Sequence, residues 1–299
     1  MNGIVKADDR VKKARHINIF LAGKSGVGKT TQATLLDPKK TLFVDLEAGE
    51  LALGDWKGDT FDVRKMATEI GAHPWELTRG LALYIGGADP ADAAGNYSKQ
   101  VYDQICGVLG EPAALDKYET IFLDSLTVAS RWALLWCKLQ PEAHSEKTGK
   151  PDTRSAYGLL GQELVRWLTH LQHAPKSIIV SAILDRFEDE LKRVTYSAQI
   201  EGAKASREID GIFDTVVTMD YLYDDRGGFL LDESGQKIRA FYPTSSNRFG
   251  FPGKDRSGTL DSIEPPDIAA LMLKSRSGKR VGNTVRTLQT AQQETVPLS

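Results

Sequence analysis

The chain has 299 residues, of which 41% are hydrophobic and 26% are charged. This length and balance exclude a disordered or fibrous chain and suit one large α/β domain or two small ones. The formal net charge of −2 excludes a strongly basic protein, although a local basic patch can still bind nucleic acid. No apolar run approaches the roughly 18 residues of a membrane span, and the sequence shows no signal peptide. We therefore expect a cytoplasmic protein without a membrane partner, with buried free thiols at Cys106 and Cys137.

The sequence divides into a core and two polar ends. Residues 1–15 are polar and basic and are predicted to form a loose arm. Residues 16–274 carry short apolar runs between amphipathic stretches, as expected of one globular core. Residues 275–299 are polar and lack helical periodicity, which predicts a disordered tail with several basic residues.

Within the core, predicted strands alternate with predicted helices. In chain order the apolar runs predict strands at 17–23, 41–47, 118–125, 177–184 and 213–219. The remaining patterns predict a helix starting at 29–36, helices at 126–139 and 157–173, a loop at 87–96, and a late β-hairpin from 227–234 and 237–243. Such alternation is typical of an α/β fold with a mostly parallel sheet and helices on both faces.

The first predicted strand leads into Gly23-Lys-Ser-Gly-Val-Gly-Lys-Thr30, which fits G-x-x-x-x-G-K-[ST] completely. In such a phosphate loop, glycines let backbone N–H groups surround the β-phosphate at a helix N-terminus. Lys29 is expected to reach the β- and γ-phosphate oxygens, and the Thr30 hydroxyl to ligate Mg²⁺. The motif therefore predicts a site for ATP and Mg²⁺. Its residues are Gly23, Ser25, Gly26, Val27, Gly28, Lys29, Thr30 and Thr31.

Acidic residues follow two other predicted strands. Asp124 ends the run Ile-Phe-Leu, the Walker B arrangement in which a carboxylate faces Mg²⁺ through water. Asp45 and Glu47 end the strand after the phosphate loop and, two residues apart, point to one side of an extended chain. An ATPase needs a carboxylate here to orient and deprotonate water. We predict Glu47 as this general base, with Asp45 as the alternative.

Two kinds of ATPase share this phosphate loop. Lys24 stands where partition-type dimeric switches carry an additional lysine. Those switches continue the Walker B strand with Asp-x-Pro-Pro, whereas here Ser125 and Leu126 follow Asp124, as in RecA and RadA. A third alternative is an ATP-binding scaffold protein that does not hydrolyse ATP.

The run Lys254-Asp255-Arg256-Ser257-Gly258 is similar to the Lys-x-Arg-x-Gly element of RadA and of DnaB-type helicases. In those assemblies, the lysine and arginine project into the ATP site of the neighbouring subunit. An arginine finger of this kind stabilises charge on the γ-phosphate and raises the rate by about 10³–10⁵. The similarity implies that Lys254 and Arg256 act in trans.

Taken together, residues 16–274 resemble the compact phage-encoded RecA-like P-loop ATPases, including the single-strand-annealing type. The segments that carry the resemblance are 23–31, 43–47, 121–125, 154–168, 199–214 and 254–258. The resemblance implies ATP-dependent binding or annealing of single-stranded DNA in recombination. It also implies a homo-oligomeric ring or filament, a single-strand-binding protein as a possible partner, and a phage protein that acts in the host cytoplasm. RecA-like proteins usually end the strand at 177–184 in a polar sensor, for which only Ser181 and Asp185 are candidates.

Two segments correspond to the mobile DNA-binding loops of the RecA fold, at about 141–156 and 185–208. Basic residues with aromatic neighbours are typical of non-specific single-strand binding. Acidic residues are interleaved with them, so ordinary solvated loops remain the alternative. The predicted DNA-binding residues are Lys147, Lys150, Arg154, Arg186, Lys192, Arg193, Lys204 and Arg207, with Phe187 and Tyr196 available for base stacking.

Overall fold

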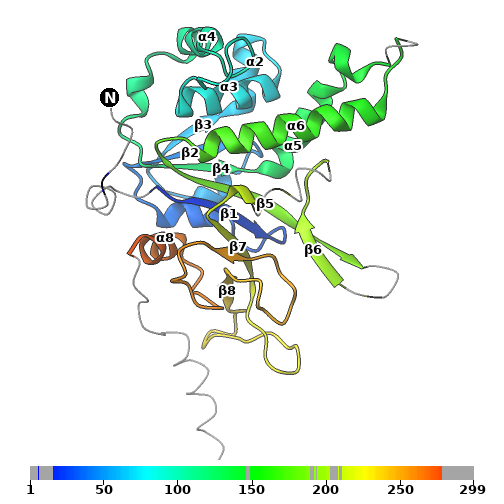
Figure 1. The fold of residues 1–299 in the computed structure, drawn as a ribbon. Helices are drawn as coiled ribbons and strands as arrows, with labels where there is room; N and C mark the ends of the chain where they lie inside the picture. Colours follow the sequence, from blue (N-terminus) through cyan, green and yellow to red (C-terminus); the bar gives the residue numbers. More distant parts are fainter. Residues whose placement is uncertain are drawn as a thin grey trace, which may run out of the picture.

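In the computed structural model (Figure 1), the described residues are 16–145, 149–188, 194–202 and 211–277, together with 6, 192 and 208. These residues form a sheet of nine strands in the order β3-β2-β4-β5-β1-β7-β8, with β6 paired to β5 and β9 to β7. The strands are β1 Asn18–Gly23, β2 Thr41–Asp45, β3 Asp59–Asp62, β4 Thr120–Asp124, β5 Ser177–Glu188, β6 Val194–Ala198, β7 Thr215–Tyr221, β8 Arg239–Tyr242 and β9 Lys254–Asp255.

The six strands from β3 to β7 in this order are parallel, and β6, β8 and β9 pair antiparallel. Since the carboxyl ends of parallel strands lie at one edge of a sheet, the ends of β1, β2 and β4 meet there. Asp45 lies directly opposite Asp124 in the register of β2 and β4. The predicted α/β fold with a mostly parallel sheet is therefore confirmed.

Alternate strand residues form two hydrophobic cores, one on each face of the sheet. Phe20 and Ala22 belong to the core beneath α2, α3, α5 and α6, whereas Ile19 and Leu21 belong to the core beneath η1 and α8. Figure 1 shows the helices on both sides of the strands. The helices are η1 Thr30–Leu35, η2 Glu50–Leu53, α2 Val63–Ile70, α3 Pro74–Gly86, α4 Lys99–Leu109, η3 Pro112–Leu115, α5 Leu126–Cys137, η4 Pro141–Ala143, α6 Thr153–Gln172 and α8 Ile268–Ser277.

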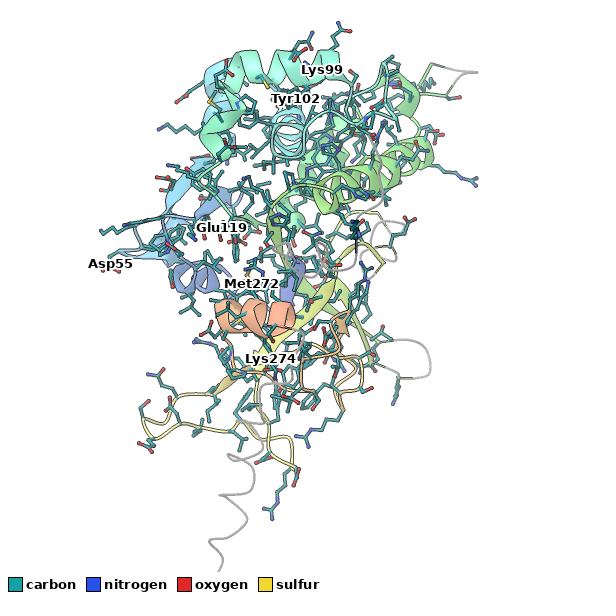
Figure 2. All side chains as sticks on the ribbon, turned by 60° about the vertical axis from the view of Figure 1, so that its left-hand side comes forward. Asp55, Lys99, Tyr102, Glu119, Met272 and Lys274 are labelled. Atoms are coloured by element: carbon teal, nitrogen blue, oxygen red, sulfur yellow. The ribbon has the colours of Figure 1, made fainter. Side chains whose placement is uncertain are left out.

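Helix α8 closes the second face and extends the core beyond its predicted boundary. Figure 2 labels Met272 and Lys274 on this helix. Met272 is buried against the sheet, while Lys274 forms ion pairs with Asp261 and Glu264 at 2.7 and 2.6 Å. Arg276 donates to the Ser177 hydroxyl at 2.7 Å. Residues 275–277 are therefore helical, which corrects the prediction that a disordered tail begins at 275. The predicted tail from 278 and, apart from residue 6, the predicted arm at 1–15 lie outside the described residues.

The helix predicted at 29–36 is instead the 3₁₀ helix η1. Thr30, Thr31 and Thr34 are β-branched and poor helix formers, and the Thr34 hydroxyl donates to the Thr31 carbonyl at 2.8 Å. Pro38 then disfavours helical backbone at Asp37. The segment therefore tightens into a short turn of helix.

Two strand predictions also change. The strand predicted at 177–184 continues to Glu188 and turns back as β6, because 194–198 is rich in residues that favour strands. The late hairpin is only partly formed within 227–243, through the bridge between Leu231 and Lys237. The main antiparallel partner of β8 is β7, with Tyr221 opposite Arg239.

The sequence did not predict helices α2, α3 and α4 or strand β3, although start signals for the helices were present. Asp62 and Ser98 cap α2 and α4 through side-chain oxygens, and His73 with Glu76 forms a capping box at α3. Gly71 ends α2 with a φ of 66°. In the part of the chain that the structure describes, no helix combines the length and apolar character that crossing a membrane needs.

Candidate nucleotide site

The phosphate loop leaves β1 at Gly23 and uses glycine where a side chain would not fit. A Cβ atom on Gly23 would lie 2.6 Å from the carbonyl oxygen of Met219. Gly26 and Gly28 have φ angles of 75° and 106°, which L side chains rarely adopt. Val27 between them is buried in the second core. One hydrophobic side chain therefore anchors the loop, while the glycines shape its backbone.

The ammonium group of Lys29 lies within the loop. It donates hydrogen bonds to the carbonyl oxygens of Gly23 and Lys24, at 2.9 and 3.0 Å. Burial lowers the pKa of Lys29, while the carboxylates of Asp124 and Glu47 act in the opposite direction. A buried cation held only by carbonyl oxygens is well placed to bind an incoming phosphate, because charged acceptors make stronger hydrogen bonds than neutral ones.

The Thr30 hydroxyl donates to Asp124 Oδ2 at 2.6 Å, and the Ser181 hydroxyl donates to the other oxygen of the same carboxylate. Burial raises the pKa of Asp124, although both hydroxyl groups and Lys29 lower it. A hydroxyl and a carboxylate in contact fit Mg²⁺, which is usually bound by few protein ligands with phosphate and water completing its shell. Consistently, no cluster of three or more His, Cys, Asp or Glu suited to a metal exists among the described residues. Ser25 and Thr31 are exposed.

Asp45 and Glu47 have clearly different surroundings. Asp45 is buried, and its carboxylate accepts hydrogen bonds from the backbone N–H groups of Glu47 and Gly49 at 2.9 to 3.1 Å. This carboxylate therefore fixes the turn that follows β2. Ala48 within the turn has a φ of 61°, a conformation that only such fixed surroundings sustain in a non-glycine residue.

The Glu47 side chain, in contrast, reaches the end of β4, where its carboxylate accepts a hydrogen bond from the Ser125 hydroxyl. Burial raises the pKa of Glu47; the Ser125 hydrogen bond lowers it, Asp124 raises it, and Lys29 and Arg131 lower it. A carboxylate with a raised pKa, close to a buried lysine and a second acid, is suited to accept a proton. Of the two candidates, the geometry favours Glu47 as the base.

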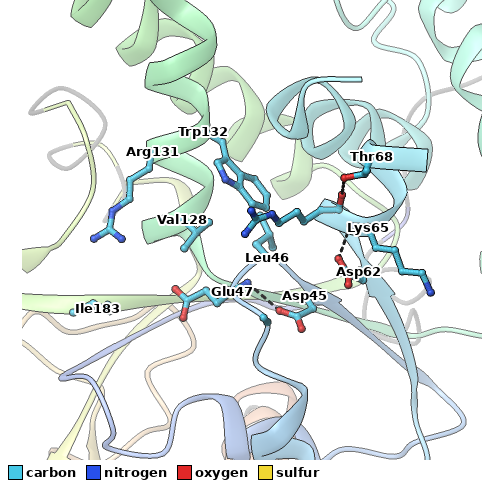
Figure 3. A pocket seen from close by; sticks show the side chains of 12 residues that line it. Asp45, Leu46, Glu47, Asp62, Lys65, Thr68, Val128, Arg131, Trp132 and Ile183 are labelled. Carbon is cyan, nitrogen blue, oxygen red and sulfur yellow. Dashed lines mark hydrogen bonds between the residues drawn. The ribbon is translucent and has the colours of Figure 1, made fainter. Parts of the chain in front are cut away.

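Glu47 opens onto a cavity of about 570 Å³ between α2 and α5, at the carboxyl ends of the strands (Figure 3). Trp132 and Arg131 of α5 extend into it from one side, and Asp62 and Thr68 lie on the other. The cavity gives water a route to the Glu47 carboxylate. No sequence motif indicated this cavity.

Lys24 forms an ion pair within its own chain. Its ammonium group lies 3.2 Å from Asp220 Oδ2, and Asp220 is 1% exposed. Partial burial acts to lower the pKa of Lys24, but Asp220 and Tyr223 outweigh it and the pKa is raised. Partition-type switches use their additional lysine in a dimer, whereas Lys24 is paired within its own chain, which weakens that alternative.

Lys254 and Arg256 lie at the opposite edge of the sheet from the phosphate loop. In β9, Lys254 pairs with Val216, near the amino end of β7. The Lys254 ammonium donates to the Phe213 carbonyl at 2.8 Å, and Arg256 forms an ion pair with Asp214 at 2.7 Å. Neither residue joins the site of its own chain, so the predicted role in trans stays a prediction.

Two neighbours of the site were not predicted. A Cβ atom on Gly49 would lie 3.3 Å from Thr30 and 3.5 Å from Asp124, so this glycine lets the turn after β2 approach the Thr30–Asp124 pair. Arg239 of β8 lies beside the phosphate loop, with its Nε 3.8 Å from the corresponding position on Gly28. The position of Gly49 shortly after the acidic end of a predicted strand was a usable sequence signal. No sequence signal indicated Arg239.

The predicted DNA-binding residues are divided between several elements. Lys150 lies in the turn before α6, Arg154 in the first turn of that helix, and Arg186 on β5, where it forms an exposed ion pair with Glu188 at 3.2 Å. Lys192 lies in the sequence between β5 and β6, which pair as the β5–β6 hairpin, residues 177–188 and 194–198. The other predicted DNA contacts, Lys147, Arg193, Lys204 and Arg207, lie outside the described residues.

The aromatic residues of the hairpin differ in availability. Phe187 is 50% exposed. Tyr196 is half-buried and packs its ring edge-to-face on Phe251, with centroids 4.9 Å apart, so its availability for base stacking stays a prediction. Figure 1 shows the hairpin and the turn before α6 on the same side of the molecule, beyond the carboxyl ends of the strands.

This phosphate loop lies on a parallel sheet, has a lysine inside it, and is followed by a threonine that contacts the aspartate at the end of β4. Together these features define a P-loop nucleotide-binding protein. Comparison with protein families agrees. Residues 15–257 match the family described as AAA domain, and the chain belongs to this family of P-loop ATPases. No curated protein matches the chain.

Proposed function

We propose that this protein is an ATPase that hydrolyses ATP with Mg²⁺ while assembled as a homo-oligomer on single-stranded DNA. The observation that carries the hydrolytic part is the position of Glu47. Its carboxylate lies at the end of the Walker B strand, hydrogen-bonded to Ser125 and next to the buried Asp124 and Lys29. A scaffold that only binds nucleotide has no need of a base in this position.

The residues of this chain divide the chemistry among themselves. Lys29 would bind the β- and γ-phosphate oxygens, and the backbone N–H groups of the loop would surround the β-phosphate. Thr30 and Asp124 would hold Mg²⁺, which supplies positive charge to the phosphates. Glu47 Oε1 accepts from Ser125, so Oε2 is the oxygen that takes the proton from the attacking water.

Phosphoryl transfer usually uses a cation on the γ-phosphate in addition to the loop lysine. Lys254 and Arg256 are candidates for this role, since Arg256 is exposed and Lys254 is half-buried on the far edge of the sheet. If a neighbouring copy docks with this edge against the nucleotide site, its Arg256 comes close to the Glu47 of the first copy. This arrangement supports an oligomer in which each site is completed in trans.

The β5–β6 hairpin supports the DNA part of the proposal. It extends the strand between the phosphate-loop strand and the Walker B strand, so a ligand on the hairpin acts close to the nucleotide. It exposes Arg186 and Phe187, a cation and an aromatic ring of the kind that bind single strands. Annealing in phage recombination, beside a single-strand-binding protein, is the biological setting that the resemblance implies.

An ATP turnover assay with and without oligo-dT tests this proposal. We expect slow basal turnover that requires Mg²⁺ and rises when the single strand is added. An ATP turnover rate that does not change when oligo-dT is added at low salt would refute the DNA-dependent function. ATP binding without any turnover would favour the scaffold alternative.

A further inference from the structure

The segment that leaves β6 docks onto α5. The Gln199 backbone N–H donates to the Ile183 carbonyl at 2.7 Å, which keeps the segment at the carboxyl edge of the sheet. The Ile183 N–H in turn donates to the Thr127 hydroxyl at 3.0 Å. One turn further along α5, the Ser130 hydroxyl accepts from the Glu201 N–H at 3.1 Å. The base of the hairpin is thus bound to the helix that follows the Walker B strand.

The same helix carries the contacts of the proposed catalytic base. Ser125 at its N-terminus donates to Glu47. Arg131, two turns along, extends into the cavity that Glu47 lines and lowers the pKa of Glu47 (Figure 3). The Arg131 guanidinium also donates to the Gln199 side-chain oxygen at 3.4 Å. Arg131 therefore lies between the catalytic carboxylate and the hairpin.

We propose that Arg131 is a positioning residue that couples the β5–β6 hairpin to Glu47. This inference rests on the proposed DNA-dependent ATPase and names the route by which DNA acts on its site. A hydrogen bond of 3.4 Å on the surface is long and costs little to break. When DNA moves the hairpin, Gln199 releases the guanidinium, which then turns fully toward Glu47 and orients its carboxylate for the attacking water.

This route explains how the chain manages without the polar sensor that RecA-like strands carry. Ser181, one of the two candidates, is fully buried and bound to Asp124, so it is committed to the metal-binding pair. Asp185 lies within the hairpin ladder, opposite Ser197. The Arg131 side chain is long and has five N–H donors, so it can bind Gln199 in one state and the Glu47 carboxylate in the other.

The test compares turnover with and without oligo-dT for the wild type, Arg131→Ala, Arg131→Lys and Arg64→Ala. Arg131 is an exposed helix residue, so alanine is compatible with folding. We expect Arg131→Ala to lower the DNA stimulation of kcat by about fivefold or more, with an unchanged KM for ATP and an unchanged Kd for DNA. Arg131→Lys should restore part of the stimulation. Arg64→Ala removes the same charge from the opposite wall of the same cavity and should behave like the wild type.

A double-mutant cycle with Gln199→Leu adds a second readout. If both residues act in one connection, the double variant should lose no more DNA stimulation than the single variant with the larger loss. Full stimulation in Arg131→Ala would overturn the inference while leaving the proposed function intact. A parallel loss of DNA affinity would also overturn it, because Arg131 would then be a DNA contact. A wild type that DNA does not stimulate would refute the proposed function, and the inference with it.

Discussion

The two ends of β7 present opposite kinds of surface. At the carboxyl end, buried Asp220 binds Lys24 of the phosphate loop, so loop and strand form one unit within the chain. At the amino end, Lys254 is half-buried, and the exposed Arg256 is paired with Asp214. The Arg256 side chain is 53% exposed, and single ion pairs at such exposure contribute little stability.

One chain therefore carries a nucleotide site at one end of β7 and, at the other end, an arginine that is suited to the site of a neighbouring copy. From Thr215 to Met219, β7 rises by about 13 Å, which separates Arg256 from the phosphate loop of its own chain. A phosphate loop that is fixed by contacts within its own chain is already formed before nucleotide or a neighbouring copy binds. The weakly held, exposed Arg256 is suited to exchange its partner for a neighbour's nucleotide. We therefore propose that the site is completed between copies.

The largest effect is expected at the carboxyl end. Lys29→Ala removes the only side-chain cation inside the loop that hydrogen-bonds loop carbonyls in the described structure. ATP turnover should fall below detection, because the β- and γ-phosphates lose their charged ligand. Lys24→Ala is the matched control and should retain most turnover, since Lys24 binds Asp220. Inactivity of Lys24→Ala alone would revive the partition-type switch.

The next effect separates the two carboxylates after β2. Glu47→Gln should lower kcat by about 10²–10⁴ and keep ATP binding, because the proton acceptor is lost while the fold is not. Asp45→Asn should instead lower the free energy of unfolding by about 1–3 kcal/mol, because an amide cannot accept all three backbone hydrogen bonds. Turnover and thermal unfolding of both variants measure this. Normal hydrolysis by Glu47→Gln would show that the base is misassigned.

A smaller effect concerns pH. The pKa of Glu47 is raised by burial, so the carboxylate is lost as pH falls through this raised value, and turnover should decline there. Ser125→Ala removes the hydrogen bond that lowers this pKa. The acidic limb of the pH–rate profile should therefore move to higher pH in this variant. A limb that moves to lower pH would contradict the proposed role of Ser125.

The smallest effect concerns salt. If basic residues bind phosphates of single-stranded DNA, affinity should fall linearly on logarithmic axes with a slope of about −0.7 per neutralised phosphate. Deleting 278–299 removes Lys279, Arg280 and Arg286 but leaves α8 whole, so the slope should become shallower if this tail contributes. Anisotropy titrations at several salt concentrations measure it. Binding that ignores salt would exclude phosphate contacts.

The sequence predicted the phosphate end of the molecule better than the helical layer above it. Glycine positions, Lys29, Thr30 and Asp124 follow from spacing along strands whose ends must meet, so a single sequence carries that information. The choice of Glu47 over Asp45 depends on which side chain satisfies the backbone of the following turn. The contact of Arg131 with Gln199 joins residues 68 positions apart, and no local pattern encodes it.

Mixing two inactive variants tests the central claim most directly. Arg256→Ala should bind ATP but fail to hydrolyse it, and Glu47→Gln should fail with its own Arg256 intact. A mixed assembly contains interfaces at which the Arg256→Ala subunit supplies the intact Glu47 and the Glu47→Gln subunit supplies the intact Arg256. Both components of the site are functional at such an interface. Turnover should therefore return in equimolar mixtures. Mixtures that stay as inactive as each variant alone, with mixed assembly verified independently, would contradict completion of the site by a neighbour.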